Sequence, residues 1–146
     1  MKRHLSLVIA ISMLVAVLAT TAQSQAAGPQ LMRAHIPFAF HVGNTELPAG
    51  EYRITVLNPS SDQKVLQIRS ADGRVSAIVN TLGAKAKSSE KSKLAFRRYG
   101  DTYFFAQAQV AGESTALAAL KSNAERTEAR TLASHGGSVT VTIAAE

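Results

Sequence analysis

The segment AHIPFAFHV, residues 34–42, alternates between two kinds of side chain with a period of two. One face is apolar, and the other carries polar or small residues together with Pro37. Because successive side chains of a strand point to opposite faces of the sheet, this pattern predicts a β-strand with one buried face. Pro37 has no backbone N–H to donate, which predicts that the strand lies at a sheet edge or contains a bulge.

The rest of the chain repeats this kind of pattern between short turns. Further strands are predicted at residues 51–56, 64–69, 74–82, 93–98, 102–110 and 138–143. The connections are short, and the pair Asp72-Gly73 favours a tight hairpin. The sequence therefore predicts a mainly all-β fold, an antiparallel meander of about seven strands. Such a meander curls into a barrel or splits into a sandwich, and we favour the barrel or half-barrel because it removes exposed edges.

One helix is predicted before the last strand. Ser122 and Glu125 have the spacing of a capping box, in which each side chain satisfies the backbone N–H of the other residue. The helix is expected over residues 123–133 and is expected to stop near Gly136 and Gly137. Residues 116–120 are also helix formers, whereas residues 83–92 show no apolar periodicity and are expected to form a mobile surface loop.

The N-terminus has the three parts of a secretory signal peptide. Basic residues at positions 2–3 precede an apolar run over residues 5–19 that is too short to span a bilayer, and a stretch of small residues follows. We predict a signal peptide over residues 1–26, cut after Ala26, with a cut after Ala22 as the alternative. Residues 27–146 then form a single domain without a membrane span, exported to the periplasm or the medium.

The charge of the chain is mildly basic. The formal net charge is +6, and removal of the two basic leader residues lowers it to +4. This favours weak attraction to anionic surfaces and falls short of a nucleic-acid-binding signature. We expect an anionic envelope polymer or a small ligand as partner. The lysines at 85, 87, 91 and 93 either contact such a polymer or form an ordinary solvated loop.

Several polar residues gather near the turn at residue 100. A patch that binds a sugar or a carboxylate is one interpretation and a turn with a local ion pair is the other; the residues concerned are Arg97, Arg98, Tyr99, Asp101 and Tyr103. His35 and His41 share the polar face of one strand about 20 Å apart, too far to hold one metal ion, so both are expected in solvent.

No catalytic or cofactor motif stands out in the sequence. There is no cysteine, no nucleophile elbow, no zinc motif and no nucleotide-binding loop. We therefore expect an exported, non-enzymatic β-domain with a binding or envelope-associated structural role, without metal or cofactor. One alternative is a barrel that holds a small apolar ligand among Phe38, Phe40, Phe96 and Phe105. A further alternative is a hydrolase acting on envelope polysaccharide, with the carboxylates of Glu51 and Asp101.

Three stretches resemble a known family when taken together, namely residues 36–53, 96–105 and 121–126, with IPFAFHVGN, LPAGEYR, FRRYGDTYFF and KSNAER as their marked segments. The chain is similar to a family of short exported bacterial proteins, frequent in soil acidobacteria, to which no function is assigned. The resemblance covers most of the mature chain and implies one exported domain. It implies no catalytic residue.

Overall fold

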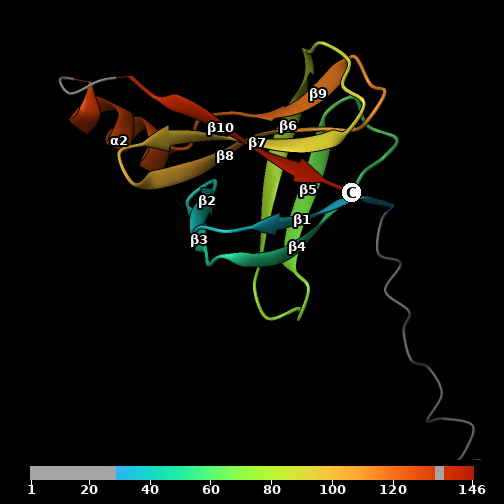
Figure 1. Ribbon diagram of the computed structural model, residues 1–146, viewed down its shortest axis with the longest axis horizontal. Helices are drawn as coiled ribbons and strands as arrows, with labels where there is room; N and C mark the ends of the chain where they lie inside the picture. Colours follow the sequence, from blue (N-terminus) through green and yellow to red (C-terminus); the bar gives the residue numbers. More distant parts are fainter. Residues whose placement is uncertain (1–28, 134–136) are drawn as a thin grey trace, which may run out of the picture.

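The computed structural model describes residues 29–133 and 137–146, which form β-strands and one helix (Figure 1). The elements are β1 (Gln30–Ile36), β2 (Phe40–Val42), β3 (Thr45–Leu47), β4 (Gly50–Val56), β5 (Lys64–Ser70), β6 (Ser76–Lys85), β7 (Ser92–Tyr99), β8 (Thr102–Gln109), β9 (Thr115–Ala119), α2 (Asn123–Leu132) and β10 (Val139–Ala145). The predicted signal peptide and both of its predicted cleavage positions lie outside the described residues. The mainly β fold with a helix before the last strand is confirmed.

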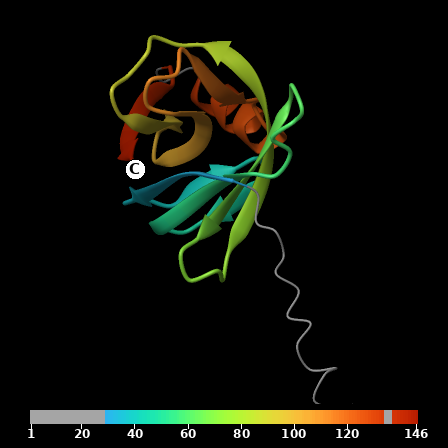
Figure 2. The ribbon, with the colours of Figure 1, turned by 90° about the vertical axis from the view of Figure 1, so that its right-hand side faces the viewer.

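The strands form one mixed sheet that curls around a single core (Figure 2). Along the sheet the order is β1-β4-β5-β6-β9-β8-β2-β3, and β7 pairs with β8 and with β10. Arg33 of β1 and Glu146, which follows β10, exchange two backbone hydrogen bonds with N···O distances of 2.7 and 2.9 Å. These bonds bring the end of β10 to β1, but the regular ladder is not closed there. The sheet therefore curls on itself without closing.

The predicted meander is only partly correct. Strands β4, β5 and β6 follow each other in sequence and in space, and β1 pairs with β4 as expected. The segment 34–42 is broken after Ile36, and β2 then turns through Gly43 to pair with β3. The break falls at Pro37, which cannot donate to a ladder. Strand β2 also pairs in parallel with β8, so the sheet is not purely antiparallel.

Residues 116–119, which are helix formers by propensity, belong to the strand β9, and Leu120 follows the end of that strand. Strand β9 pairs with β6 along its length and with β8 at Ala118 and Leu117. Alanine favours helices in isolation, but ladder pairing on both sides overrides that weak preference. The predicted loop 83–92 is too long, because pairing with β9 extends β6 to Lys85. Gly83 to Lys85 continue β6 and Ser92 begins β7, so only residues 86–91 lie outside strands.

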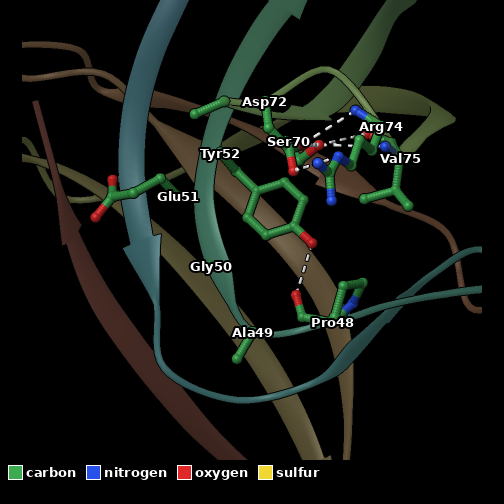
Figure 3. Close-up of a pocket in the computed structure, with 10 residues that line it drawn as sticks. Pro48, Ala49, Gly50, Glu51, Tyr52, Ser70, Asp72, Arg74 and Val75 are labelled. Carbon is green, nitrogen blue, oxygen red and sulfur yellow. Dashed lines mark hydrogen bonds and ion pairs between the residues drawn. The ribbon is translucent and has the colours of Figure 1, made fainter.

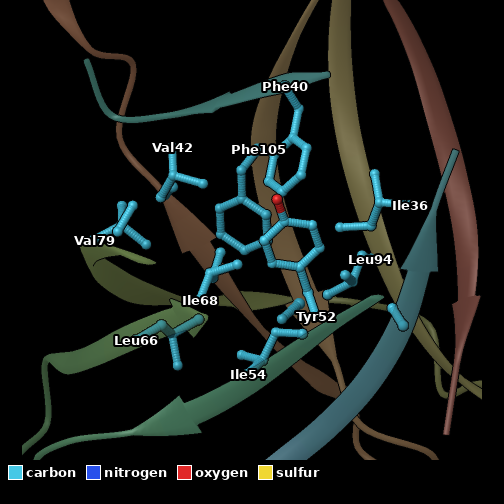
Figure 4. Packing of buried hydrophobic residues seen from close by; sticks show 14 of the residues in the cluster. Ile36, Phe40, Val42, Tyr52, Ile54, Leu66, Ile68, Val79, Leu94 and Phe105 are labelled. Atoms are coloured by element: carbon cyan, nitrogen blue, oxygen red, sulfur yellow. The ribbon is translucent and has the colours of Figure 1, made fainter. Parts of the chain in front are cut away.

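The apolar faces of the strands meet in one aromatic-rich core (Figure 4). Ile36, Phe40, Ile54, Leu66, Ile68, Leu94 and Phe96 have no measurable exposure, and Tyr52 is 2% exposed. The ring of Phe40 meets Tyr52 and Phe96 edge-on, with centroids 5.1 and 5.3 Å apart. Edge-to-face contacts of this kind add about 0.5 to 1.5 kcal/mol each beyond the burial of apolar area. Period-two burial thus builds the predicted hydrophobic interior.

The second face of the β7–β8 hairpin is also covered. Phe105 points into the core, while Phe104 lies on the opposite face. The Phe104 ring contacts Tyr99 and His41, with centroids 5.9 and 4.9 Å away. Helix α2 covers the same region, where its Leu132 approaches the turn at Gly100. Aromatic residues at neighbouring positions of β8 are therefore both buried, one on each side of the sheet.

Candidate functional site

The residues predicted to form a binding patch lie on the β7–β8 hairpin and its turn. Because neighbouring strand residues point to opposite faces, the set is divided. Arg97 and Tyr99 reach α2, where they contact one carboxylate. Arg98 and Tyr103 lie together on the other face, and Asp101 is in the turn. The structure does not bring these side chains into one patch.

Arg97 and Glu125 form a buried ion pair between β7 and α2. The Arg97 Nε donates to Glu125 Oε1, and its Nη2 donates to Oε2 at 2.9 Å. The Tyr99 hydroxyl donates to the same Oε1 at 3.1 Å. The Glu125 side chain is only 2% exposed and that of Arg97 is 20% exposed. A buried ion pair persists only when its hydrogen bonds are satisfied, so this network fixes the helix on the sheet.

Glu125 completes only half of the predicted capping box. Its backbone N–H donates to Ser122 Oγ at 3.1 Å, as the spacing predicts. Its carboxylate turns toward Arg97 and Tyr99 rather than back to the backbone of Ser122. A charge-assisted pair with a guanidinium is stronger than a bond to one backbone N–H. The partner comes from another element of the sheet, which local spacing does not reveal.

Arg98 is engaged by its own turn. Its Nε donates to the carbonyl oxygen of Gly100 at 2.6 Å, and its Nη2 lies 3.4 Å from Asp101 Oδ1. The guanidinium carbon lies 5.5 Å from the centre of the Tyr103 ring, which stacks on Phe38 at 3.9 Å. The geometry is that of a turn with a local ion pair, the second of the two interpretations of this segment.

The two strand histidines occupy different environments. His35 Nδ1 lies 2.8 Å from Glu51 Oε1, and both side chains are exposed. His41 is half-buried, and its ring stacks on Phe104. Its Nδ1 is buried without a hydrogen-bond partner among the described residues. The expectation that both histidines lie in solvent is therefore wrong for His41, because β8 and its outer aromatic residue pack against β2.

A hollow of about 420 Å³ opens where β4 begins and the β5–β6 turn lies (Figure 3). The Tyr52 hydroxyl donates to the carbonyl oxygen of Pro48 at 2.6 Å on one side. On the other, Asp72 accepts from the Ser70 hydroxyl at 2.5 Å and from the backbone N–H of Arg74 at 3.0 Å. The hollow thus has a largely apolar wall and a polar rim that is already hydrogen-bonded.

These contacts shift two pKa values in opposite directions. Burial raises the pKa of Tyr52 above its usual value, and the charge of Asp72 adds to that effect. The hydrogen bond from Ser70 lowers the pKa of Asp72, with the Arg74 N–H as a second cause. Tyr52 therefore stays a neutral donor, and Asp72 stays an ionised acceptor held by its own turn.

Three exposed arginines stand directly opposite each other on the outer face of β1, β4 and β5. Arg33 is the register partner of Arg53, and Arg53 is the partner of Arg69. We call these residues the arginine row. None of them forms an ion pair with any described residue. Like charges directly opposite each other destabilise a sheet, so the row carries an electrostatic cost.

The polar contacts of the arginine row are to uncharged oxygen atoms. Arg33 Nε lies 3.5 Å from Gln30 Oε1, and Arg69 Nη2 lies 3.4 Å from the carbonyl oxygen of Gly73. Gly73 has φ of +75°, and a Cβ there would lie 3.0 Å from Arg69 Nη2. The turn therefore leaves room for the guanidinium beside it. Sequence reasoning missed the row because its members are far apart in the chain and only the strand register aligns them.

The chain matches no protein-family model, no curated protein and no solved structure. Within residues 29–133 and 137–146, no three His, Asp or Glu side chains are grouped so that they could hold a metal ion. The helix in the described part of the chain is too short to cross a membrane.

Proposed function

We propose that the chain is an exported, non-enzymatic domain that binds an anionic ligand through the arginine row. The observation that carries this proposal is the register Arg33–Arg53–Arg69, with its exposed guanidinium groups and no carboxylate partner among the described residues. An anion that binds there removes the repulsion between neighbouring arginines. Arginine is suited to this role because its planar donors match carboxylate and phosphate groups in pairs.

The exported location rests on the sequence. Residues 1–26 have the charge, apolar run and small residues of a signal peptide. The resemblance to short exported bacterial proteins points the same way. In the periplasm or the medium, polymers of the cell envelope are the anions that such a domain meets. The net charge of +4 after cleavage favours the encounter.

The non-enzymatic role is supported by the way the charged side chains are used. Polysaccharide hydrolysis needs two carboxylates about 5 to 10 Å apart across a cleft. Glu51 contacts His35 on the neighbouring strand β1, and Asp101 contacts Arg98 on its own hairpin, so each of the two candidate carboxylates already has a side-chain partner. Glu125 is committed to holding the helix. The three arginines of the row form no ion pair with any described residue, and guanidinium groups suit anion binding better than proton transfer.

A small ligand is the second candidate, and the hollow beside Tyr52 favours it. The phenylalanines predicted to surround such a ligand contact each other instead, with Phe38 and Phe105 both packed on Phe96. The hollow is lined by Pro48 and Val75 and is the better place for an apolar group. Binding of an apolar fluorescent probe that is lost in Val75→Asp and kept in Arg53→Gln is the result that supports this candidate.

A charge-matched pair of variants tests the leading proposal. Arg33→Gln/Arg53→Gln/Arg69→Gln and Lys85→Gln/Lys87→Gln/Lys91→Gln each remove three positive charges, the first from the arginine row and the second from the loop 86–91 and its border. Retention of the mature protein on immobilised polyanions is measured against salt concentration. We expect the arginine variant to lose retention and the lysine variant to keep most of it. Equal losses refute a specific role for the row. Shortening of a dissolved polymer on incubation refutes the non-enzymatic role.

A further inference from the structure

The arginine row has a neutral polar row beside it on the same face. Gln30 pairs with Thr55, and Thr55 pairs with Gln67. Thr55 and Gln67 lie two residues along their strands from the arginines, and Gln30 lies three residues from Arg33 because the register shifts between Gln30 and Met32. Strand spacing of about 4.8 Å makes each row about 10 Å long across the strands. A linear ligand lying across β1, β4 and β5 therefore meets a line of cations and a parallel line of amide and hydroxyl groups.

A shallow hollow joins the two rows. It has a volume of about 390 Å³ and is lined by Arg53 and Arg69, by Thr55 and Gln67, and by the turn 70–73. Guanidinium groups recognise anions in a planar, two-pronged geometry. Amide and hydroxyl groups both donate and accept hydrogen bonds, as sugar hydroxyls require. The same hollow is thus lined by cationic and by neutral polar side chains, and this combination suits a ligand that carries a charged group and hydroxyl groups on each unit.

The acidic residues at the borders of the face select against dense charge. Glu51 lies beyond the arginine row on β4, paired with His35, and Asp72 lines the hollow from the turn. The fold keeps Asp72 ionised, since the Ser70 hydroxyl lowers its pKa. A polymer with a charge on every short repeat places anions against these carboxylates. A polymer with one carboxylate per sugar matches three cations within acidic borders.

From these features we infer that the ligand of the arginine row is an acidic polysaccharide with one carboxylate per sugar. Its carboxylates meet the arginine row, and its hydroxyls meet Thr55 and Gln67. This inference rests on the proposed function, because it names the ligand class of the same site. A phosphate polymer is the competing ligand and is an outcome of the test below.

The probes are polygalacturonate, the same polymer with its carboxylates methyl-esterified, and inorganic polyphosphate at equal charge concentration. Dissociation constants are measured by calorimetry with the mature protein. Arg33→Gln/Arg53→Gln/Arg69→Gln is expected to weaken polygalacturonate binding about thirtyfold, or about threefold per exposed contact. Lys85→Gln/Lys87→Gln/Lys91→Gln is the matched control, with an expected loss below threefold. Thermal unfolding confirms that each variant is folded.

Two further comparisons separate the sugar from its charge. Esterification is expected to weaken binding about as much as loss of the arginine row does, since both remove the same ion pairs. Thr55→Val/Gln67→Met keeps every arginine and is expected to weaken polygalacturonate binding about threefold or more while leaving polyphosphate binding unchanged.

The outcomes distinguish the two proposals. Tighter binding of polyphosphate than of polygalacturonate, still dependent on the arginine row, overturns the polysaccharide inference and leaves the anion-binding function standing. An unchanged affinity of Thr55→Val/Gln67→Met for polygalacturonate also overturns the inference. If no polyanion binds in a manner that depends on the row, both proposals fall.

Discussion

The network of Arg97, Glu125 and Tyr99 is the part of the fold whose energetics can be predicted most sharply. Glu125→Leu leaves the guanidinium of Arg97 without its carboxylate at a site where only 20% of the arginine side chain is exposed. Arg97→Met leaves the carboxylate of Glu125, which is 2% exposed, with the Tyr99 hydroxyl as its remaining side-chain partner. The double variant removes both charges and replaces them with apolar side chains of similar length.

The expected costs follow from the geometry. Removing one partner of a buried ion pair costs about 3 to 5 kcal/mol of unfolding free energy. Water reaches part of Arg97, so we expect about 3 kcal/mol for Glu125→Leu, and about 4 kcal/mol for Arg97→Met because the carboxylate is the more buried charge. The double variant is expected to cost only about 1 to 2 kcal/mol, mainly for the Tyr99 hydroxyl left without an acceptor.

The free energies of unfolding of the parent, the two single variants and the double variant are measured by urea unfolding at neutral pH. The predicted coupling is large: the double variant is more stable than either single variant. If the two single costs instead add to within about 0.5 kcal/mol, the residues are independent and the reasoning is refuted. The same holds if either single substitution costs less than about 1 kcal/mol, a value typical of exposed pairs.

Three further predictions concern the sheet face and the hollow. Arg53→Glu places a carboxylate between two arginines and is expected to raise the unfolding free energy by about 0.5 to 1 kcal/mol at low salt, with the gain shrinking at high salt; a loss of stability contradicts the like-charge argument. Tyr52→Phe removes the bond to Pro48 at a cost of about 1 kcal/mol at neutral pH. Because the pKa of Tyr52 is raised in the fold, the neutral Tyr52 side chain stabilises the fold fully below about pH 10, and this stabilisation is lost as the pH rises further. The unfolding free energy of Tyr52→Phe is therefore expected to depend less on alkaline pH than that of the parent. Because the pKa of Asp72 is lowered, its contribution is present above about pH 4 and is lost as the pH falls, so urea midpoints of Asp72→Asn are expected to vary less below that pH; an unchanged acid profile contradicts this.

Much of the fold follows from local pattern in the sequence. Alternation places Ala34, Ile36 and Tyr52 in the core, and Ser122 begins the helix as its spacing predicts. Local pattern does not predict the strand β9, because its alanine-rich sequence favours a helix. The segment forms a strand because it pairs with β6 and β8. Pairing between distant segments decides such cases, and a single sequence does not display it.

The candidate sites differ in the same way, since local pattern bears on one of them and strand register decides the other. Strand alternation by itself places Arg97 and Arg98 on opposite faces of β7, so the periodicity of the sequence already argues against one patch that contains both. The arginine row cannot be found in this way, because Arg33, Arg53 and Arg69 lie opposite one another only through the registers of two strand pairs. A one-residue slip in either register moves a member to the other face.

The most direct test of the anion-binding account maps the contact surface. Amide ¹H–¹⁵N spectra of the mature protein are recorded while polygalacturonate is added until binding saturates. The account predicts that the largest shift changes fall on Arg33, Arg53 and Arg69, with Thr55 and Gln67 beside them. Changes concentrated in the loop 86–91 or at the turn around Gly100, with the arginine row unaffected, contradict it.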